Sequence, residues 1–312
     1  MPVHGGPSTL FLIVARDPAT GELGVAVQSH WFGIGPLVPW VEAGVGAIAT
    51  QSFVDPSYGK LGPELMRAGK SAPETLKELL AADDGRDIRQ VATIDTQGRV
   101  AAHTGRGRTS RRQAIRFGNN FSVQANLMLN DTIWPAMARA FESAKGDLAD
   151  RMMAALDAAQ AAGGDIRGRQ SAALIVVSGK STGKPWVDRR FDLRVDDSAD
   201  PLKELRRPAV VQRAPYNHMN AGDLAVEAQD DNQGHCASIQ PAAALAPGNM
   251  EMVFWHAAAL VNMGRVDESL PPFRQRLHRA DRNWRTPDAS PGRRRSSSRR
   301  SEGDRSDLNA AN

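Results

Sequence analysis

The chain has 312 residues, of which 41% are hydrophobic and 5% aromatic, so it can bury a sizeable core built mainly from aliphatic side chains. Its single cysteine, Cys236, excludes an internal disulfide framework and fits a reducing compartment. The net charge is only +4, and much of the basic excess lies in residues 285–312, so charge does not mark the folded part as a nucleic-acid binder.

The N-terminal stretch "GGPSTLFLIVARDPATGELGVAVQS", residues 5–29, predicts a β-hairpin. Residues 10–16 form an almost continuous apolar run, which is typical of a strand buried on both faces. Residues 23–29 are rich in valine, and the segment between the two runs carries Asp, Pro and Gly, which favour turns. A further strand is predicted over residues 43–52, "AGVGAIATQS".

Helices and strands then follow in groups. Residues 71–82 predict a helix, because Ser71 and Glu74 have the spacing of a capping box. The next predicted elements are a hairpin (91–95 and 100–103), a strand (121–129), two helices (131–144 and 147–162), two strands (170–179 and 186–197) and a helix capped by Asp200. This order lacks the strict alternation of a doubly wound sheet. It predicts an α+β fold with two stacked, mostly antiparallel sheets and helix pairs outside.

The composition of the chain changes after Pro208. From there on it is rich in alanine, and its pattern predicts helices and no strand. Gly264, Phe273 and Leu277 fall where a tetratricopeptide repeat needs its small and bulky positions. We expect Pro271-Pro272 to disturb the second helix of this unit. One and a half repeats would either dock on the main domain or bind a protein partner.

Residues 285–312 predict a disordered basic tail, because they lack an apolar run. The stretch "GRRRSSSRR" would contact nucleic acid or acidic surfaces, or would simply be solvated. No apolar run approaches the roughly 18 residues of a membrane helix. No Lys or Arg precedes "LFLIVA", which is too short for the core of a signal peptide. We therefore expect a cytoplasmic protein that does not bind membranes.

Common catalytic motifs are missing from the sequence. It has no phosphate-binding glycine loop, no metal-binding pair on a helix and no nucleophile elbow. His235 and Cys236 supply only two ligands, whereas structural zinc takes four, so we predict neither a metal nor a cofactor. His103 lies on a predicted strand, but a lone histidine there is usually structural, because a catalytic base needs a placed partner.

Hydroxyl and amide side chains remain as candidates. An N-terminal Ser or Thr carries both a nucleophile and its base, because a free α-amino group titrates near pH 8. Ser8 and Thr9 stand just ahead of the first strand and would become such residues after cleavage. This chemistry also needs oxyanion donors, which backbone N–H groups or side-chain amides supply. The strand-borne amides are Gln28, Gln51, Gln124, Asn126 and Gln170, each of which also fits an ordinary polar position at a strand edge.

Five blocks together resemble the DUF1028 family: "FLIVARDPATGELGVAVQS", "VGAIATQSFVDPSYG", "FSVQANLML", "RGRQSAALIVV" and "FDLRVDD" followed by "ADPLKELRR". The resemblance covers residues 9–207, and residues 216–284 look like the helical extension of some members. The family is similar to N-terminal nucleophile (Ntn) hydrolases. This similarity implies a four-layer αββα sandwich and hydrolysis of amide bonds.

Family members commonly begin Met-Thr-Phe-Ser, so that removal of Met exposes the threonine. In this chain Leu10 occupies the position of that threonine and Leu12 the position of the serine. Cleavage before Ser8 or Thr9 would restore a hydroxyl at the terminus. A shift of one residue, however, turns a strand side chain to the opposite face of its sheet.

The resemblance also implies roles for residues farther along the chain. Asn126 and Gln51 would stabilise the oxyanion, and Ser29 is a second hydroxyl candidate. The remaining oxyanion or substrate-binding positions that match the family are Gln28, Gln124, Gln170 and Ser171.

We expect four regions: an N-terminal extension (1–8), an Ntn-hydrolase-like domain (9–207), a tetratricopeptide-like helical region (208–284) and the basic tail (285–312). The first hypothesis is a hydrolase acting on an amide bond of a small molecule or peptide. The alternatives are a catalytically inactive protein that binds a small ligand, and an interaction protein that uses its helical region and tail. We also expect a homo-oligomer.

Overall fold

The computed structural model describes residues 10–106, 114–212, 237 and 250–283. The chain divides at residue 220 into two compact units. The first unit contains two sheets, and every strand pairing within them is antiparallel. The prediction of a mixed fold with two antiparallel sheets is therefore confirmed.

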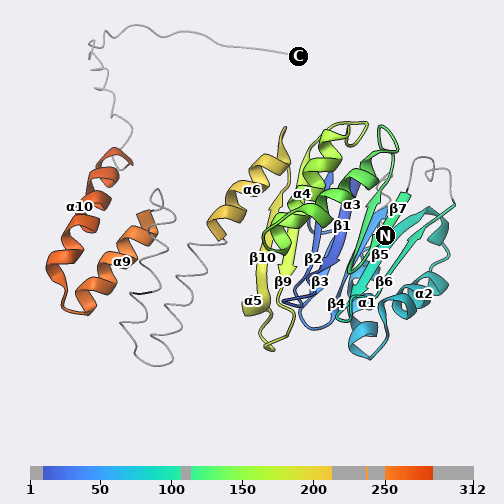
Figure 1. Cartoon of the computed structure of the whole chain (residues 1–312), viewed down its shortest axis with the longest axis horizontal. Coiled ribbons are helices and arrows are strands. Elements are labelled where there is room, and N and C mark those ends of the chain that lie inside the picture. Colours follow the sequence, from blue (N-terminus) through green and yellow to red (C-terminus); the bar gives the residue numbers. More distant parts are fainter. Residues whose placement is uncertain (1–9, 107–113, 213–236, 238–249, 284–312) are drawn as a thin grey trace, which may run out of the picture. The chain divides into compact units, whose positions relative to one another are not determined.

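The larger sheet has six strands in the order β10-β9-β2-β1-β8-β7, so the first strand of the chain lies near its centre (Figure 1). These strands are β1 (Leu10–Arg16), β2 (Leu23–Ser29), β7 (Ala114–Gly118), β8 (Phe121–Ala125), β9 (Ser171–Val177) and β10 (Arg189–Val195). The smaller sheet has the order β3-β4-β5-β6. Its strands are β3 (Pro39–Glu42), β4 (Gly46–Ser52), β5 (Arg89–Asp95) and β6 (Val100–Thr104).

Helices pack against both sheets. The helices α1 (Ser57–Arg67) and α2 (Ala72–Ala82) contact the four-stranded sheet. The helices α3 (Ile133–Ser143), α4 (Leu148–Ala161) and α6 (Pro201–Val211) contact the six-stranded sheet. Two short helices, η1 (Arg86–Ile88) and α5 (Pro185–Asp188), precede β5 and β10.

Strand β1 is apolar throughout because both of its faces are covered. Leu10, Leu12 and Val14 are fully buried in a cluster that also contains residues of β4 and β5 in the other sheet. Phe11 and Ile13 point the other way and pack in a second cluster with residues of α3 and α4. The period-2 alternation of a strand thus assigns each β1 side chain to one of two buried layers.

Most predicted elements are present at the predicted places. The helix α2 has Ser71 as its N-cap, and the reciprocal capping box with Glu74 is formed, with Ser71 N–H donating to Glu74 Oε2 over 2.8 Å. Strands β3 and β7 and helix α1 were not predicted. Pro208, after which the composition of the sequence changes, lies inside α6.

The second unit contains α9 (Met250–Asn262) and α10 (Val266–Asn283). Contrary to our expectation, Pro271 and Pro272 lie within α10 and do not end it. Helix α10 packs against α9. The rings of Phe254 in α9 and Phe273 in α10 lie 5.9 Å apart in an edge-to-face arrangement. Packing between the two helices therefore compensates for the hydrogen bonds that the prolines cannot make. No helix in the described parts of the chain is long and apolar enough to cross a membrane.

Candidate functional site

Polar side chains gather between the two sheets at the end where β1 begins. In the register of the smaller sheet, Gln51 pairs with Gln90, and Gln90 pairs with Thr104. Gln51 and Gln90 are fully buried and alternate with Ala49 and Ala92, which pack between the sheets. Their side chains therefore face the six-stranded sheet.

Gln90 joins this row to the start of β1. Its Oε1 accepts hydrogen bonds from Gln51 Nε2 and from Asn126 Nδ2, the latter over 3.2 Å. Its Nε2 donates to Thr104 Oγ1 over 3.0 Å. Asn126 Oδ1 in turn accepts the backbone N–H of Leu10 over 3.3 Å. The first residue of β1 is thus connected to the other sheet through two buried amides.

Gln124 makes a second connection between the sheets. It pairs with Leu12 in the register of β1 and β8, and it is fully buried. Its Nε2 donates to the backbone carbonyl of Val91 in β5 over 3.0 Å. We refer to Gln51, Gln90, Gln124 and Asn126 as the amide cluster.

Two predicted hydroxyl groups lie on the same face at this end of the larger sheet. Ser29 pairs with Leu10 on one side and with Ser171 on the other. Both serines are fully buried, and they alternate with Val27 and Ala173, which pack between the sheets. Ser171 Oγ donates to the carbonyl oxygen of Trp31.

Two of the predicted amides lie elsewhere. Gln28 pairs with Phe11, on the face of the sheet that α4 covers, and its Nε2 donates to Gln160 Oε1 of α4 over 2.5 Å. Gln170 donates to Asp197 Oδ1 over 3.1 Å, in an exposed contact. The structure therefore brings Gln51, Gln124 and Asn126 together but separates Gln28 and Gln170 from them. Ser8 and Thr9 lie outside the described residues.

Leu10 decides whether the amide cluster can have a nucleophile beside it. It occupies the position that the resemblance gives to the nucleophile, and its side chain is fully buried between the sheets. A hydroxyl at this position would face the amide cluster, but a leucine side chain cannot act as a nucleophile.

Gln90 was missed in the sequence because the predicted strand began at Val91. The signal was present: Gln90 continues the alternation of Ala92 and Ile94, so it belongs to the inward-facing side of β5. A buried polar residue at the start of an inward-facing series calls for a hydrogen-bond partner.

The backbone is unusual directly after two members of the cluster. Among the described residues, three non-glycine residues have a positive φ, and two of them are Ser52 (φ 69°) and Leu127 (φ 49°). Ser52 follows Gln51, and Leu127 follows Asn126. Positive φ is unfavourable for side chains such as leucine and concentrates at functional sites. This strain supports a functional role for the place.

An ion-pair network fixes the chain that follows Ser52. Arg89 pairs with Ser52 in the sheet, and its Nη1 donates to the carbonyl of Phe53 over 2.6 Å. Arg89 Nε lies 2.9 Å from Asp83 Oδ2, which also accepts the hydroxyl of Tyr58 over 3.0 Å. Burial and the hydrogen bond to Asp83 raise the pKa of Tyr58.

We expect Asp83→Asn to lower the free energy of unfolding at pH 7 by about 1–2 kcal/mol. Burial opposes ionisation of Asp83, but hydrogen bonds from Arg89, Gly85 and Tyr58 outweigh it and lower its pKa. A lowered carboxyl pKa contributes stability above about pH 4 that is lost as the pH falls further. Urea unfolding of both proteins should therefore show a difference at pH 7 that shrinks by pH 3. A difference that does not change with pH would contradict this account.

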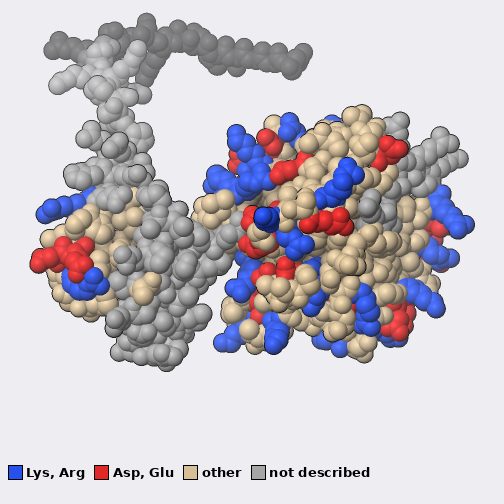
Figure 2. All heavy atoms as spheres, in the orientation of Figure 1, with Lys and Arg blue, Asp and Glu red and all other residues tan. Residues whose placement is uncertain are grey.

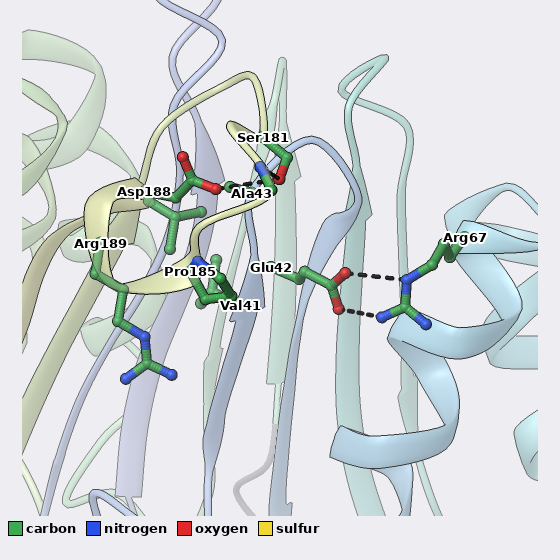
Figure 3. A pocket seen from close by; sticks show the side chains of 10 residues that line it. Val41, Glu42, Ala43, Arg67, Ser181, Pro185, Asp188 and Arg189 are labelled. Carbon is green, nitrogen blue, oxygen red and sulfur yellow. Dashed lines mark hydrogen bonds and ion pairs between the residues drawn. The ribbon is translucent and has the colours of Figure 1, made fainter.

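A cavity of about 450 Å³ lies at the opposite end of the sheets, where β3 and β9 end (Figure 3). Its charged groups already have partners. Arg67 Nε lies 3.1 Å from Glu42 Oε1, and Asp188 accepts the hydroxyl of Ser181 over 3.1 Å. Arg189 pairs with Asp192. Burial opposes ionisation of Asp188, but hydrogen bonds from Thr182, Ser181 and Ser178 outweigh it and lower its pKa. Its carboxylate is thus a weak base for the Ser181 hydroxyl. The amide cluster is therefore the better candidate.

Basic and acidic side chains are interspersed over the face of the first unit that Figure 2 shows. Within the described ranges, no three His, Cys, Asp or Glu side chains gather in a way that could hold a metal ion. Cys236 and His235 lie outside these ranges. His103 Nε2 lies 2.8 Å from the carbonyl oxygen of Arg86, which is a structural contact.

One protein family and several solved structures match the chain, among them the two that follow. The model of a "Family of unknown function (DUF1028)" matches residues 10–205. The crystal structure of protein SPO2555 from Silicibacter pomeroyi, assigned to DUF1028, is 26% identical with a TM-score of 0.58, and the match covers 71% of this chain and 94% of that one. Anbu (ancestral beta-subunit) from Yersinia bercovieri is 12% identical with a TM-score of 0.31, covering 70% of this chain and 97% of that one. No curated protein matches the chain.

Proposed function

The chain belongs to the DUF1028 family, and from the geometry at the start of β1 we propose that it hydrolyses an amide bond of a small molecule or peptide. The observation that carries the proposal is the hydrogen bond from the Leu10 N–H to Asn126 Oδ1, within a cluster of buried amides. Such a cluster provides uncharged N–H donors at the place where the first strand starts. Donors of this kind stabilise a developing oxyanion.

The packing of the first unit supports a four-layer αββα sandwich of the Ntn type. One apolar cluster lies between the sheets, a second joins the six-stranded sheet to α3 and α4, and a third joins the four-stranded sheet to α1 and α2. In this proposal the amide cluster lies at the end of the two inner layers where β1 begins.

Strand alternation favours Ser8 over Thr9 as the nucleophile. Leu10 and Leu12 face the space between the sheets, so in a processed chain whose strand begins at Ser8 the serine would share that face. Thr9 would share the face of Phe11 and point toward the α3 and α4 layer. We therefore propose that cleavage before Ser8 creates the active terminus.

The proposed reaction uses the terminal residue as both nucleophile and base. The Ser8 hydroxyl oxygen bonds to the substrate carbonyl carbon, and its proton passes to the α-amino group. Asn126 Nδ2 and Gln51 Nε2 each give one N–H to Gln90 Oε1, and in this proposal the second N–H of each donates to the oxyanion. The C–N bond breaks as the α-ammonium returns the proton to the departing amine, which leaves an ester on Ser8. Water then attacks this ester while the α-amino group takes its proton, and the proton returns to Ser8 Oγ as the C–O bond of the ester breaks and the acid departs.

The test is the mass of the mature N-terminus in protein purified from its native host. We expect residues 1–7 to be absent. Ser8→Ala in the mature protein should then prevent covalent labelling of the terminus by an acylating β-lactone, whereas Thr9→Val should not. An intact terminus at Pro2 would contradict the proposal.

One observation favours a second function, an inactive protein that binds a small ligand between the sheets. The fully buried Leu10 side chain fills the position of the family's nucleophile. An intact Pro2 terminus would support this alternative. Binding of a protein partner by the helical region and self-association remain predictions.

A further inference from the structure

We propose that the amide cluster binds an uncharged carboxamide group, which donates an N–H to Oε1 of Gln51. The inference rests on the proposed function for the place of the site, and it names the chemical group that enters there. It does not require that the bound group be hydrolysed.

The orientation of each amide in the cluster follows from a backbone group. The N–H of Leu10 can only donate, so the Asn126 atom that it contacts is the oxygen. The nitrogen of Asn126 therefore faces Gln90, and the Gln90 atom that it contacts must be the oxygen. That same oxygen is contacted by Gln51, so the contacting atom of Gln51 is its nitrogen. The usual ambiguity between the two ends of an amide is thus removed.

This chain of contacts leaves Gln51 Oε1 as an obligatory acceptor. Gln51 is fully buried, and its Oε1 has no hydrogen-bond partner among the residues that the structure describes. Gln124 gives a second case. A carbonyl can only accept, so the atom that contacts Val91 O is the nitrogen, and the buried Oε1 of Gln124 is also without a described partner. Buried acceptors without partners are costly and rare, and each one requires an explanation.

Gln28 differs from the residues of the amide cluster. Its Oε1 is also buried without a described partner. Its hydrogen bond joins it to another side-chain amide, that of Gln160, so both amides can be reversed together. Gln28 moreover lies on the other face of the sheet.

The charge of the surroundings selects the kind of group that is bound. Among the described residues that strand register places on the inner faces at this end, the polar side chains are amides and hydroxyls, namely Ser29, Gln51, Gln90, Thr104, Gln124, Asn126 and Ser171. A carboxylate would place its oxygens against the open acceptors. An ammonium would be buried without a counter-charge. A carboxamide supplies N–H donors at no cost of burying a charge.

Binding to the full-length protein tests the inference with three probes of similar size: isobutyramide, isobutyrate and isobutylammonium. We expect titration calorimetry to show isobutyramide binding at least about tenfold more tightly than either ion, because both ions meet the penalties above. Equal affinities, tighter binding of an ion, or no binding of isobutyramide would overturn the inference. The last outcome would mean that water alone occupies the open acceptors.

Gln51→Met removes the acceptor while keeping the length of the side chain. We expect it to weaken isobutyramide binding at least about fivefold, which is the order of one lost hydrogen bond. Gln160→Met on α4, the matched control, should bind as the parent does. If Gln51→Met does not fold, Gln124→Met replaces it, and the preference among the three probes in the parent still decides.

The inference and the proposed function can fail separately. If a protein with an intact Pro2 terminus binds the carboxamide, the result contradicts the proposed hydrolase function and supports carboxamide binding. A processed, labelled terminus without any preference for isobutyramide would keep the hydrolase proposal and remove the inference.

Discussion

Replacing Gln90 with leucine is expected to lower the free energy of unfolding by about 3 kcal/mol. The substitution removes the one oxygen that accepts from both Gln51 Nε2 and Asn126 Nδ2. Two buried donors would then lack a partner, and each costs about 1–3 kcal/mol. Denaturant unfolding measures the loss, provided that the slope with denaturant stays unchanged.

Gln97→Leu is the matched control, because Gln97 is exposed in the turn between β5 and β6, and its loss should be within about 0.5 kcal/mol. Gln90→Glu tests the hydrogen-bond acceptor separately from the shape of the side chain. It keeps an acceptor for both donors, but burial raises the pKa of the new carboxyl group. Its stability should therefore fall as the pH rises above about 4. A loss below about 1 kcal/mol for Gln90→Leu would mean that Gln51 and Asn126 find other partners.

Sequence patterns were sufficient for the elements whose signals are local. The apolar runs of β1 and β2, the turn between them and the capping box of α2 are each contained within a few residues. Helix α1 could not be predicted in this way, because it contains Gly59, Gly62 and Pro63. Its glycines serve tertiary packing: a Cβ on Gly62 would lie 1.8 Å from the side chain of Ile48. Propensity and packing disagree there, and packing prevails.

The candidate site was predictable in part. Gln51, Gln124 and Asn126 were identified, and the structure brings them together. Gln28 could have been separated from Ser29 by alternation alone, because neighbouring strand residues face opposite sides. The contact between Gln90 and Asn126 could not have been predicted, because it joins two sheets and depends on how they stack.

Position 10 offers the sharpest test of whether the site can support catalysis. A chain that lacks residues 1–9 and carries Leu10→Thr should gain reactivity toward an acylating β-lactone by about 10²-fold or more over the parent. The new hydroxyl would take the place of the Leu10 side chain, which faces the amide cluster. The new α-amino group would take the place of the N–H that Asn126 Oδ1 accepts, so Asn126 would orient the base.

The matched control is the same deletion with Leu10→Val. Valine has nearly the same branched shape as threonine but carries no hydroxyl. Both variants remove buried apolar surface at Leu10 and should lose about 1–3 kcal/mol of unfolding free energy, so stability alone cannot explain a difference in labelling. Intact-protein mass spectrometry measures the rate and site of acylation. If the threonine and valine variants are labelled equally, the amide cluster does not activate a terminal hydroxyl. The inactive, ligand-binding function then becomes the better account, because Leu10 would mark a site that binds a ligand without reacting with it.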